Sequence, residues 1–218
     1  MTNDDLRCDV TAELDWDPRV DSTAIEVSAA DGVVTLRGTA ASLRHKRSAD
    51  AAAARVRGVI RVADDLTVRI PDRDRRDDEN LRGDVLEALM LESSVPMTVD
   101  AQASDGIVTL TGMVEWHYQR QAAESRTASV PGVACIDNAI TLAPATVAGA
   151  VADTIRRAFR RDAVLDAARL SAEICPGGRA ILSGTVGSLA ARDRAVAAAW
   201  SAAGVVDVDD RIGVEYAP

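Results

Sequence analysis

Apolar residues at helical spacing open each of three similar segments of the chain. In every segment three apolar residues follow one another at intervals of four, which places them on one face of a helix. Short stretches of alternating apolar and polar residues come next, and this alternation is typical of a strand with one buried face. The three helical stripes are Leu6/Val10/Leu14, Leu81/Val85/Leu89 and Val151/Ile155/Phe159.

A turn motif recurs after each stripe, so the three segments are internal repeats. An Asp-Gly or Gly-Gly pair supplies the positive φ of a tight hairpin turn, and a strand rich in Val, Ile, Leu and Thr leads from it to another glycine. A second helix with small inward residues, a Gly-Val pair and a last aliphatic strand complete the repeat. The motif occupies residues 31–38, 105–112 and 177–184, and the Gly-Val pairs begin at Gly58, Gly132 and Gly204.

The order of elements in each repeat is α-β-β-α-β. This order predicts an α+β fold in which two helices pack on a three-stranded sheet. In the first repeat we expect strands at about 25–29, 33–37 and 62–68. Residues 71–79, which follow the first repeat, contain no apolar residue other than Pro71, and this composition is typical of a solvated linker. We therefore expect domains at 1–70, 80–143 and 144–218, with the charged linker at 71–79.

Local signals predict how the turns close and where the helices begin. We expect the glycines that end the turn motif, at 38, 112 and 184, to hold backbone that a side chain would obstruct. The glycines of the Gly-Val pairs are expected at the left-handed C-caps of the second helices. Polar residues near the first helices serve as N-caps. The expected N-caps are Asp4 or Asp5, Asn80 and Thr146.

The combination of these motifs resembles the BON (bacterial OsmY and nodulation) domain. The resemblance rests on Asp-Gly, Val-Thr-Leu, Gly, an Ala-rich helix, Gly-Val and a closing Asn/Asp-x-Ile/Leu-x-Val, and it covers nearly the whole chain. The segments 115–120 and 198–200 resemble BON proteins that carry several copies and lack a signal sequence. The resemblance implies a non-enzymatic module associated with osmotic stress and envelope maintenance, for which phospholipid surfaces are a proposed ligand.

The net charge and the distribution of apolar residues exclude several classes of protein. The chain of 218 residues has a net charge of −9 and a pI near 4.8, which argues against a nucleic-acid binder. No stretch reaches the ~18 apolar residues that cross a bilayer. The acidic N-terminus lacks the features of a secretory signal, so we expect a cytoplasmic protein, with peripheral association with the inner membrane as a second option.

The sequence offers no catalytic constellation. It has three cysteines and no CxxC pair, and it lacks the HExxH, GxSxG and P-loop motifs. We therefore expect no enzyme activity, no metal and no cofactor.

The first helix of the third repeat concentrates arginines on its outward side. Such a face fits phosphate headgroups or an acidic partner. The alternative is a solvated face that Asp153 and Asp162 neutralise. The arginines are Arg156, Arg157, Arg160 and Arg161.

The first helix of the middle repeat is apolar on two faces. Leu86, Met90 and Leu91 stand where the third repeat has Arg156, Arg160 and Arg161. A helix that is apolar most of the way round is buried, so we expect this face to contact another repeat or a second chain and to hold the repeats in a compact assembly. Two alternatives are insertion into lipid, which Glu87 and Glu92 disfavour, and completion of the local core by a rotated helix.

Two classes of function fit these observations. The first is a binding or scaffold protein that acts through protein–protein contacts in a stress response. The second is a peripheral module that binds phospholipid at a membrane surface. The acidic charge weakens a simple anionic-membrane interpretation, and a homo-oligomer stays open as one form of protein contact.

Overall fold

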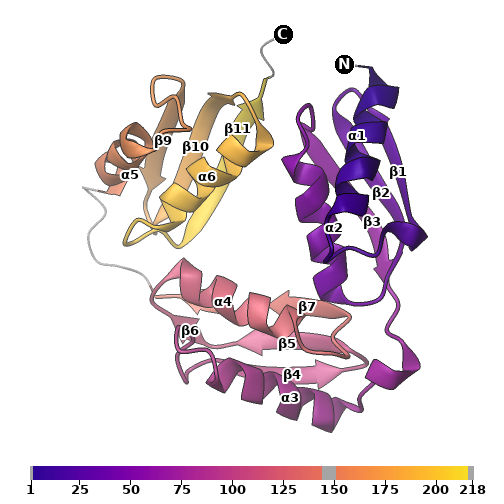
Figure 1. Cartoon of the computed structure of the whole chain (residues 1–218). Coiled ribbons are helices and arrows are strands. Elements are labelled where there is room, and N and C mark those ends of the chain that lie inside the picture. Colours follow the sequence, from indigo (N-terminus) through magenta and orange to yellow (C-terminus); the bar gives the residue numbers. More distant parts are fainter. Residues whose placement is uncertain (1, 144–150, 216–218) are drawn as a thin grey trace. The chain divides into compact units, whose positions relative to one another are not determined.

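The computed structural model describes residues 2–143 and 151–215 (Figure 1). Each repeat folds as α-β-β-α-β, so the predicted α+β class is confirmed. The chain forms two compact units. The first unit comprises Met1–Gly112 and Arg120–Ile140, and the second comprises Met113–Gln119 and Thr141–Pro218.

The first repeat has a three-stranded sheet in which β2 is central. Strand β1 pairs with β2 in antiparallel orientation, and β3 pairs with β2 in parallel orientation. A parallel pair needs a crossover, and the second helix supplies it. The elements are α1 (Asn3–Trp16), β1 (Ile25–Ala30), β2 (Val33–Ala40), α2 (Leu43–Arg55) and β3 (Arg61–Val68), and short 3₁₀ turns cover Ser22–Ala24 and Asp72–Asp74.

The second repeat has the same strand order, and its last two strands are interrupted. The central strand stops before Gly112, and a short parallel pair, β6 and β8, follows the main sheet along the chain. The helices are α3 (Asp78–Met90) and α4 (His117–Ala128). The strands are β4 (Asp100–Ser104), β5 (Ile107–Thr111), β6 (Met113–Val114), β7 (Cys135–Asn138) and β8 (Thr141–Leu142).

The third repeat again places its second strand at the centre of the sheet, with one antiparallel and one parallel neighbour. Its core contains Phe159 among aliphatic and alanine side chains, and the partly buried Trp200 packs against it. The elements are α5 (Val151–Arg161), β9 (Leu170–Cys175), β10 (Arg179–Val186), α6 (Leu189–Trp200) and β11 (Asp207–Val214).

Backbone geometry accounts for the turn motif. Asp31 and Gly32 both have positive φ, at 50° and 78°, as a tight hairpin turn between β1 and β2 requires. The glycine at the end of the motif allows a close approach to the preceding segment. At Gly112 an added Cβ would lie 2.3 Å from the carbonyl oxygen of Thr98, so the predicted obstruction is confirmed.

The Gly-Val pairs have the predicted positive φ, but they are not helix C-caps. Helix α4 ends at Ala128, four residues before Gly132. The N–H of Val133 donates to the carbonyl of Val130 at 3.4 Å, so Pro131 and Gly132 are the central residues of a turn. Proline followed by glycine with positive φ is typical of a type II turn, and this explains the glycine better than a cap does.

The predicted N-caps were wrong in the two repeats where they can be compared. Thr2 caps α1, and its side chain accepts from the N–H of Asp5 while Asp5 accepts from Thr2. Asp77 caps α3 and accepts from the N–H of Asn80. Each cap lies two or three residues before the expected one, because each helix begins with polar residues that precede its first apolar residue. Thr146 lies outside the described residues.

A carboxylate at the end of the first helix recurs in all three repeats. We call Asp17, Glu92 and Asp162 the helix-end carboxylates. Each accepts a hydrogen bond from the backbone N–H two residues further on, over 2.9–3.4 Å. Each also pairs with an arginine of the second helix. The pairs are Asp17–Arg55, Glu92–Arg126 and Asp162–Arg194, at 2.9, 2.9 and 3.1 Å.

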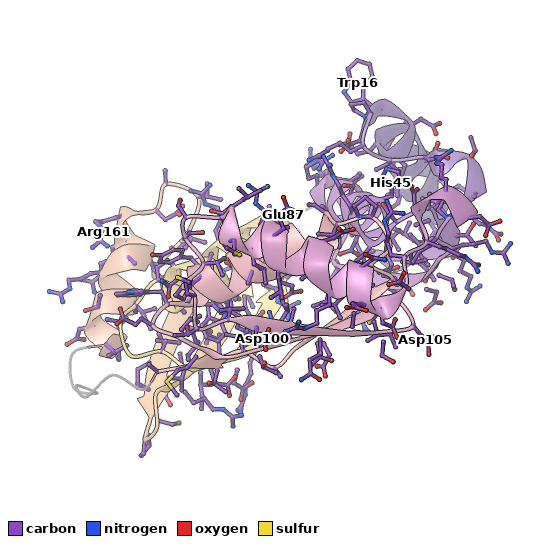
Figure 2. All side chains as sticks on the ribbon, turned by 90° about the horizontal axis from the view of Figure 1, so that it is seen from below. Trp16, His45, Glu87, Asp100, Asp105 and Arg161 are labelled. Carbon is purple, nitrogen blue, oxygen red and sulfur yellow. The ribbon has the colours of Figure 1, made fainter. Side chains whose placement is uncertain are left out.

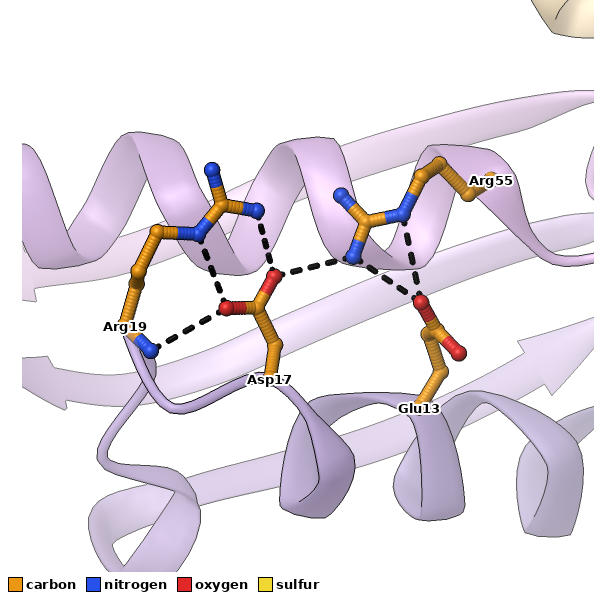
Figure 3. A network of polar contacts seen from close by, with 4 residues as sticks. All are labelled: Glu13, Asp17, Arg19 and Arg55. Atoms are coloured by element: carbon orange, nitrogen blue, oxygen red, sulfur yellow. Dashed lines mark hydrogen bonds and ion pairs between the residues drawn. The ribbon is translucent and has the colours of Figure 1, made fainter.

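The first repeat has the most extensive version of this contact (Figure 3). Asp17 is buried and accepts from Arg19 and Arg55, while Arg55 also donates to Glu13. Hydrogen bonds from Arg19, and then from Arg55, hold the pKa of Asp17 well below its usual range. The network ends α1, turns the chain toward β1 and joins α1 to α2.

A glycine exchange in the second domain tests the close approach. Because Gly112 has φ 132° and no room for a Cβ, Gly112→Ala is expected to lower the free energy of unfolding by about 1–3 kcal/mol. Gly83 is the control, because an added Cβ there meets no atom within 4 Å. Gly83→Ala is expected to raise stability by about 0.5–1 kcal/mol. Urea unfolding of the full chain measures both, and an unchanged Gly112→Ala midpoint would contradict the close approach.

Acid titration tests the helix-end carboxylate of the first domain. Since its folded pKa lies below the unfolded value, Asp17 stabilises the fold above about pH 4 and loses this effect as pH falls further. Asp17→Asn is therefore expected to lower the Tm at pH 7, by a difference that narrows toward pH 3. Asp9→Asn, on the exposed side of α1, is the control. A Tm difference that is the same at both pH values would contradict the ionic role.

Candidate functional site

The outward side of the first helix carries different chemistry in each domain. Three exposed side chains stand at equivalent positions here: Trp16 ends α1, Leu91 directly follows α3, and Arg161 ends α5. Trp16 is 82% exposed and Leu91 is 74% exposed. Figure 2 shows Trp16 and Arg161 projecting from the ends of their helices. The same place in the fold therefore presents an aromatic, an aliphatic and a cationic group.

The arginines of α5 form an exposed basic face. The buried stripe of this helix is Val151/Ile155/Phe159, and the four arginines lie outside it. Arg156 is anchored, because it pairs with Asp153 at 2.6 Å and donates to the carbonyl of Ala172 at 3.2 Å. Arg157 donates to the hydroxyl of Thr154.

Asp162 does not neutralise this face. It pairs with Arg194 of α6 as the helix-end carboxylate of the third domain. Of the two acids expected to balance the arginines, only Asp153 pairs with one of them. In the part of the chain that the structure describes, Arg157, Arg160 and Arg161 have no carboxylate within 4.0 Å. The face is therefore cationic.

Helix α3 presents the opposite kind of surface. Leu86 is half-buried, whereas Met90 and Leu91 are exposed to 78% and 74%. Met90 thus does not complete the local core, and contact of these residues with another domain or a second chain stays a prediction. Leaving such a side chain in water forgoes roughly 1.5–3 kcal/mol relative to full burial.

The segment after α3 turns this face into a groove. We call it the α3 groove; its volume is about 360 Å³. Leu89 and Val99 are buried in it, and Met97, at 96% exposure, stands at its edge. The loop side of the groove could not be predicted from the sequence, because apolar residues in a loop follow no helical or strand period. The lining residues are Leu86, Leu89, Met90, Val95, Pro96, Met97, Val99 and Asp100.

Acidic groups border the α3 groove. Glu87 projects from α3 and Asp100 from the neighbouring strand β4 (Figure 2). Asp100 pairs with Arg82 at 3.1 Å, while Glu87 is exposed. Glu92 holds the loop in place, and hydrogen bonds from Ser94 and Arg126 lower its pKa. Residues 80–142 contain 3 basic and 8 acidic residues, a net charge of −5.

Among the described residues, no three His, Cys, Asp or Glu side chains are grouped as a metal site. Cys8, Cys135 and Cys175 are free thiols. No helix in the described ranges is long and apolar enough to cross a bilayer. The arrangement offers surfaces for binding, one acidic and apolar, the other basic.

Comparison with solved structures adds little. Two structures of CdsD, a structural protein of the type III secretion system of Chlamydia trachomatis, align over 99% and 98% of this chain and over 100% and 93% of theirs. Sequence identities are 15% and 16%, and TM-scores are 0.27 and 0.28, which are too low to support an argument. None of the curated proteins matches the chain.

Comparison with protein-family models identifies the family of all three repeats. The BON domain model matches residues 2–70, 77–144 and 148–216, which cover nearly the whole chain. BON domains are generally non-catalytic modules associated with membranes and phospholipids. The matched segments each contain one α-β-β-α-β repeat with its two glycine turns. The chain therefore belongs to the BON domain family, of which it carries three tandem copies.

Proposed function

We propose that this protein is a non-enzymatic binding protein that acts through protein–protein contacts, in the osmotic or envelope stress setting that its family implies. The observation that carries the proposal is the exposed apolar surface of the second domain. Met90, Leu91 and Met97 are each at least 74% exposed beside an apolar groove. Exposed apolar groups gathered at one place, with a polar border, mark interaction sites.

The comparison between repeats supports the same proposal. The first and third repeats have polar or charged residues at the positions of Leu86 and Met90, namely Thr11 and Asp15 or Arg156 and Arg160. All three repeats fold alike, so the fold does not need apolar residues there. The two apolar residues of the second domain are therefore best explained by a contact with another molecule.

Photo-crosslinking tests this function. The chain is produced in its own cells with a photoreactive methionine analogue in place of methionine, and adducts are mapped by mass spectrometry. We expect adducts to one protein at Met90 and Met97, because these side chains lie in the proposed contact. Excess unlabelled wild-type chain is expected to suppress the adducts, and excess Met90→Gln/Met97→Gln chain is not. Adducts that both competitors suppress equally, or none at either residue, would contradict the proposal.

The basic face of α5 supports a second candidate, binding to a phospholipid surface. Arg157, Arg160 and Arg161 are exposed and have no carboxylate partner among the described residues. Exposed arginines near an anionic membrane each contribute about 1 kcal/mol of attraction. Residues 143–218 contain 9 basic and 9 acidic residues and have no net charge. They therefore repel an anionic membrane less than the second domain does, with its net charge of −5.

Vesicle co-sedimentation tests the second candidate. We expect the full chain to pellet with phosphatidylglycerol vesicles at low salt and to be released at high salt, because such attraction is screened. Arg160→Glu/Arg161→Glu is expected to abolish pelleting. Arg44→Glu changes an exposed arginine of the first domain and is the control. Pelleting that persists in the α5 variant would exclude this face, and no pelleting at low salt would exclude the candidate.

A further inference from the structure

We propose that the α3 groove binds a cationic amphipathic helix of another protein. The inference rests on the proposed function and names the chemistry of the partner. It follows from four properties of the groove and its surroundings: its apolar lining, the occupied backbone of its strand, the open surface of α3 beside it, and its acidic border.

The lining fits a row of apolar side chains. Leu89 and Val99 form a buried floor, and Leu86 is half-buried beside them. Met90 and Met97 stand at the open edges, where they are 78% and 96% exposed. Methionine is flexible and polarisable, so it adapts to the shape of a partner. Grooves of this type accept helices whose anchors recur at i, i+3, i+4 and i+7.

An extended peptide could in principle bind here by pairing with strand β4, but hydrogen bonds within the domain already occupy the backbone of β4 at Ala101. Strand β4 is an edge strand, and an extended peptide would pair with its free backbone groups. The N–H of Ala101 already donates to the Oδ1 of Asp100 at 2.8 Å. The carbonyl of Ala101 accepts from the Nε of Arg82 at 2.7 Å. Binding in the groove therefore depends on side chains, as it does for a docked helix.

The surface of α3 lets a second helix approach closely. Glu79, Gly83, Leu86 and Met90 follow one another along one side of α3, at spacings of four, three and four residues. An added Cβ at Gly83 would meet no atom within 4 Å, so this place is open. A partner helix that fills the groove with apolar side chains can therefore continue over Gly83.

The border determines the charge of the partner. Glu79 and Glu87 are exposed on α3, and Asp100 lies on the strand side. Arg82, which is basic, is engaged at this border with Asp100 and Ala101. Lysine or arginine residues flanking an apolar stripe complement this pattern. The same acidic border repels an anionic bilayer, so a protein segment is favoured over a lipid surface.

Methyl NMR of the full chain tests the proposal. The chain is labelled at the methionine methyl groups, and a synthetic peptide of about 18 residues is added, with leucines at helical spacing and lysines elsewhere. We expect the Met90 and Met97 signals to shift while that of Met113, exposed outside the groove, does not. A peptide with glutamates in place of lysines, and one with alanines in place of leucines, are expected to bind at least about tenfold more weakly.

Variants separate the groove from general attraction. Met90→Gln/Met97→Gln is expected to weaken binding of the leucine–lysine peptide at least about tenfold, and Met113→Gln is the matched control with unchanged affinity. Glu87→Lys is expected to weaken the lysine peptide and strengthen the glutamate peptide. These residues are exposed, so thermal unfolding is expected to show an unchanged Tm.

Several results would overturn the proposal. These are equal affinity of the lysine and glutamate peptides, unchanged affinity in the Met90→Gln/Met97→Gln chain, or the absence of shifts at Met90 and Met97. Shifts at these methyls with anionic vesicles would assign the groove to lipid. A dimer of the wild-type chain that the double variant abolishes would assign it to a second copy. If the peptides fail while photo-crosslinking yields the expected adducts, the protein-binding function stands and only the cationic helix is wrong.

Discussion

The helix-end carboxylate is the contact on which the shape of each domain depends. Placed one or two residues after the first helix, Asp17, Glu92 or Asp162 binds the backbone two residues on and an arginine of the second helix. Hydrogen bonds to the charged form lower the pKa of all three. One group thus ends a helix, turns the chain toward the edge strand and joins two helices. Because the three helices end within one residue of the same place, Trp16, Leu91 and Arg161 stand at equivalent positions.

A second repeated contact joins the first half of the second helix to the last strand. Lys46 pairs with Asp64 at 3.3 Å, and Arg192 pairs with Asp210 at 2.7 Å in the same register. In the second domain Arg120 instead donates to the backbone carbonyl of Asn138. The acidic or amide residue also accepts from the N–H two residues on in every domain. The second helix is therefore tied both to α1, α3 or α5 and to the parallel strand.

Most of the fold could be predicted from the sequence because it depends on residues that align between the repeats. The buried stripes, the Asp-Gly turns and the glycines stand in one register, and each has a local physical cause. The partner arginines do not align: Arg126 matches Ala52 and Arg194 matches Ser48, whereas the first domain uses Arg55. These positions lie on one helix face at spacings of four and three, so each reaches the same carboxylate from a different turn. Such a contact cannot be found by matching equivalent positions of the repeats. The loop side of the α3 groove escapes prediction for another reason, because apolar residues in a loop follow no helical or strand period.

The separation of inward and outward positions explains how one fold carries two opposite surfaces. A change at Gly112 or in a buried stripe disturbs packing, whereas exchange at an exposed surface position usually alters stability by less than about 0.5 kcal/mol. The outward side of the first helix can therefore change from Thr11 and Asp15 to Leu86 and Met90, or to Arg156 and Arg160, without altering the domain. The apolar groove with its acidic border and the cationic helix face are opposite in charge and differ in polarity. Three copies of a small non-catalytic fold thus provide three chemically distinct surfaces on one chain.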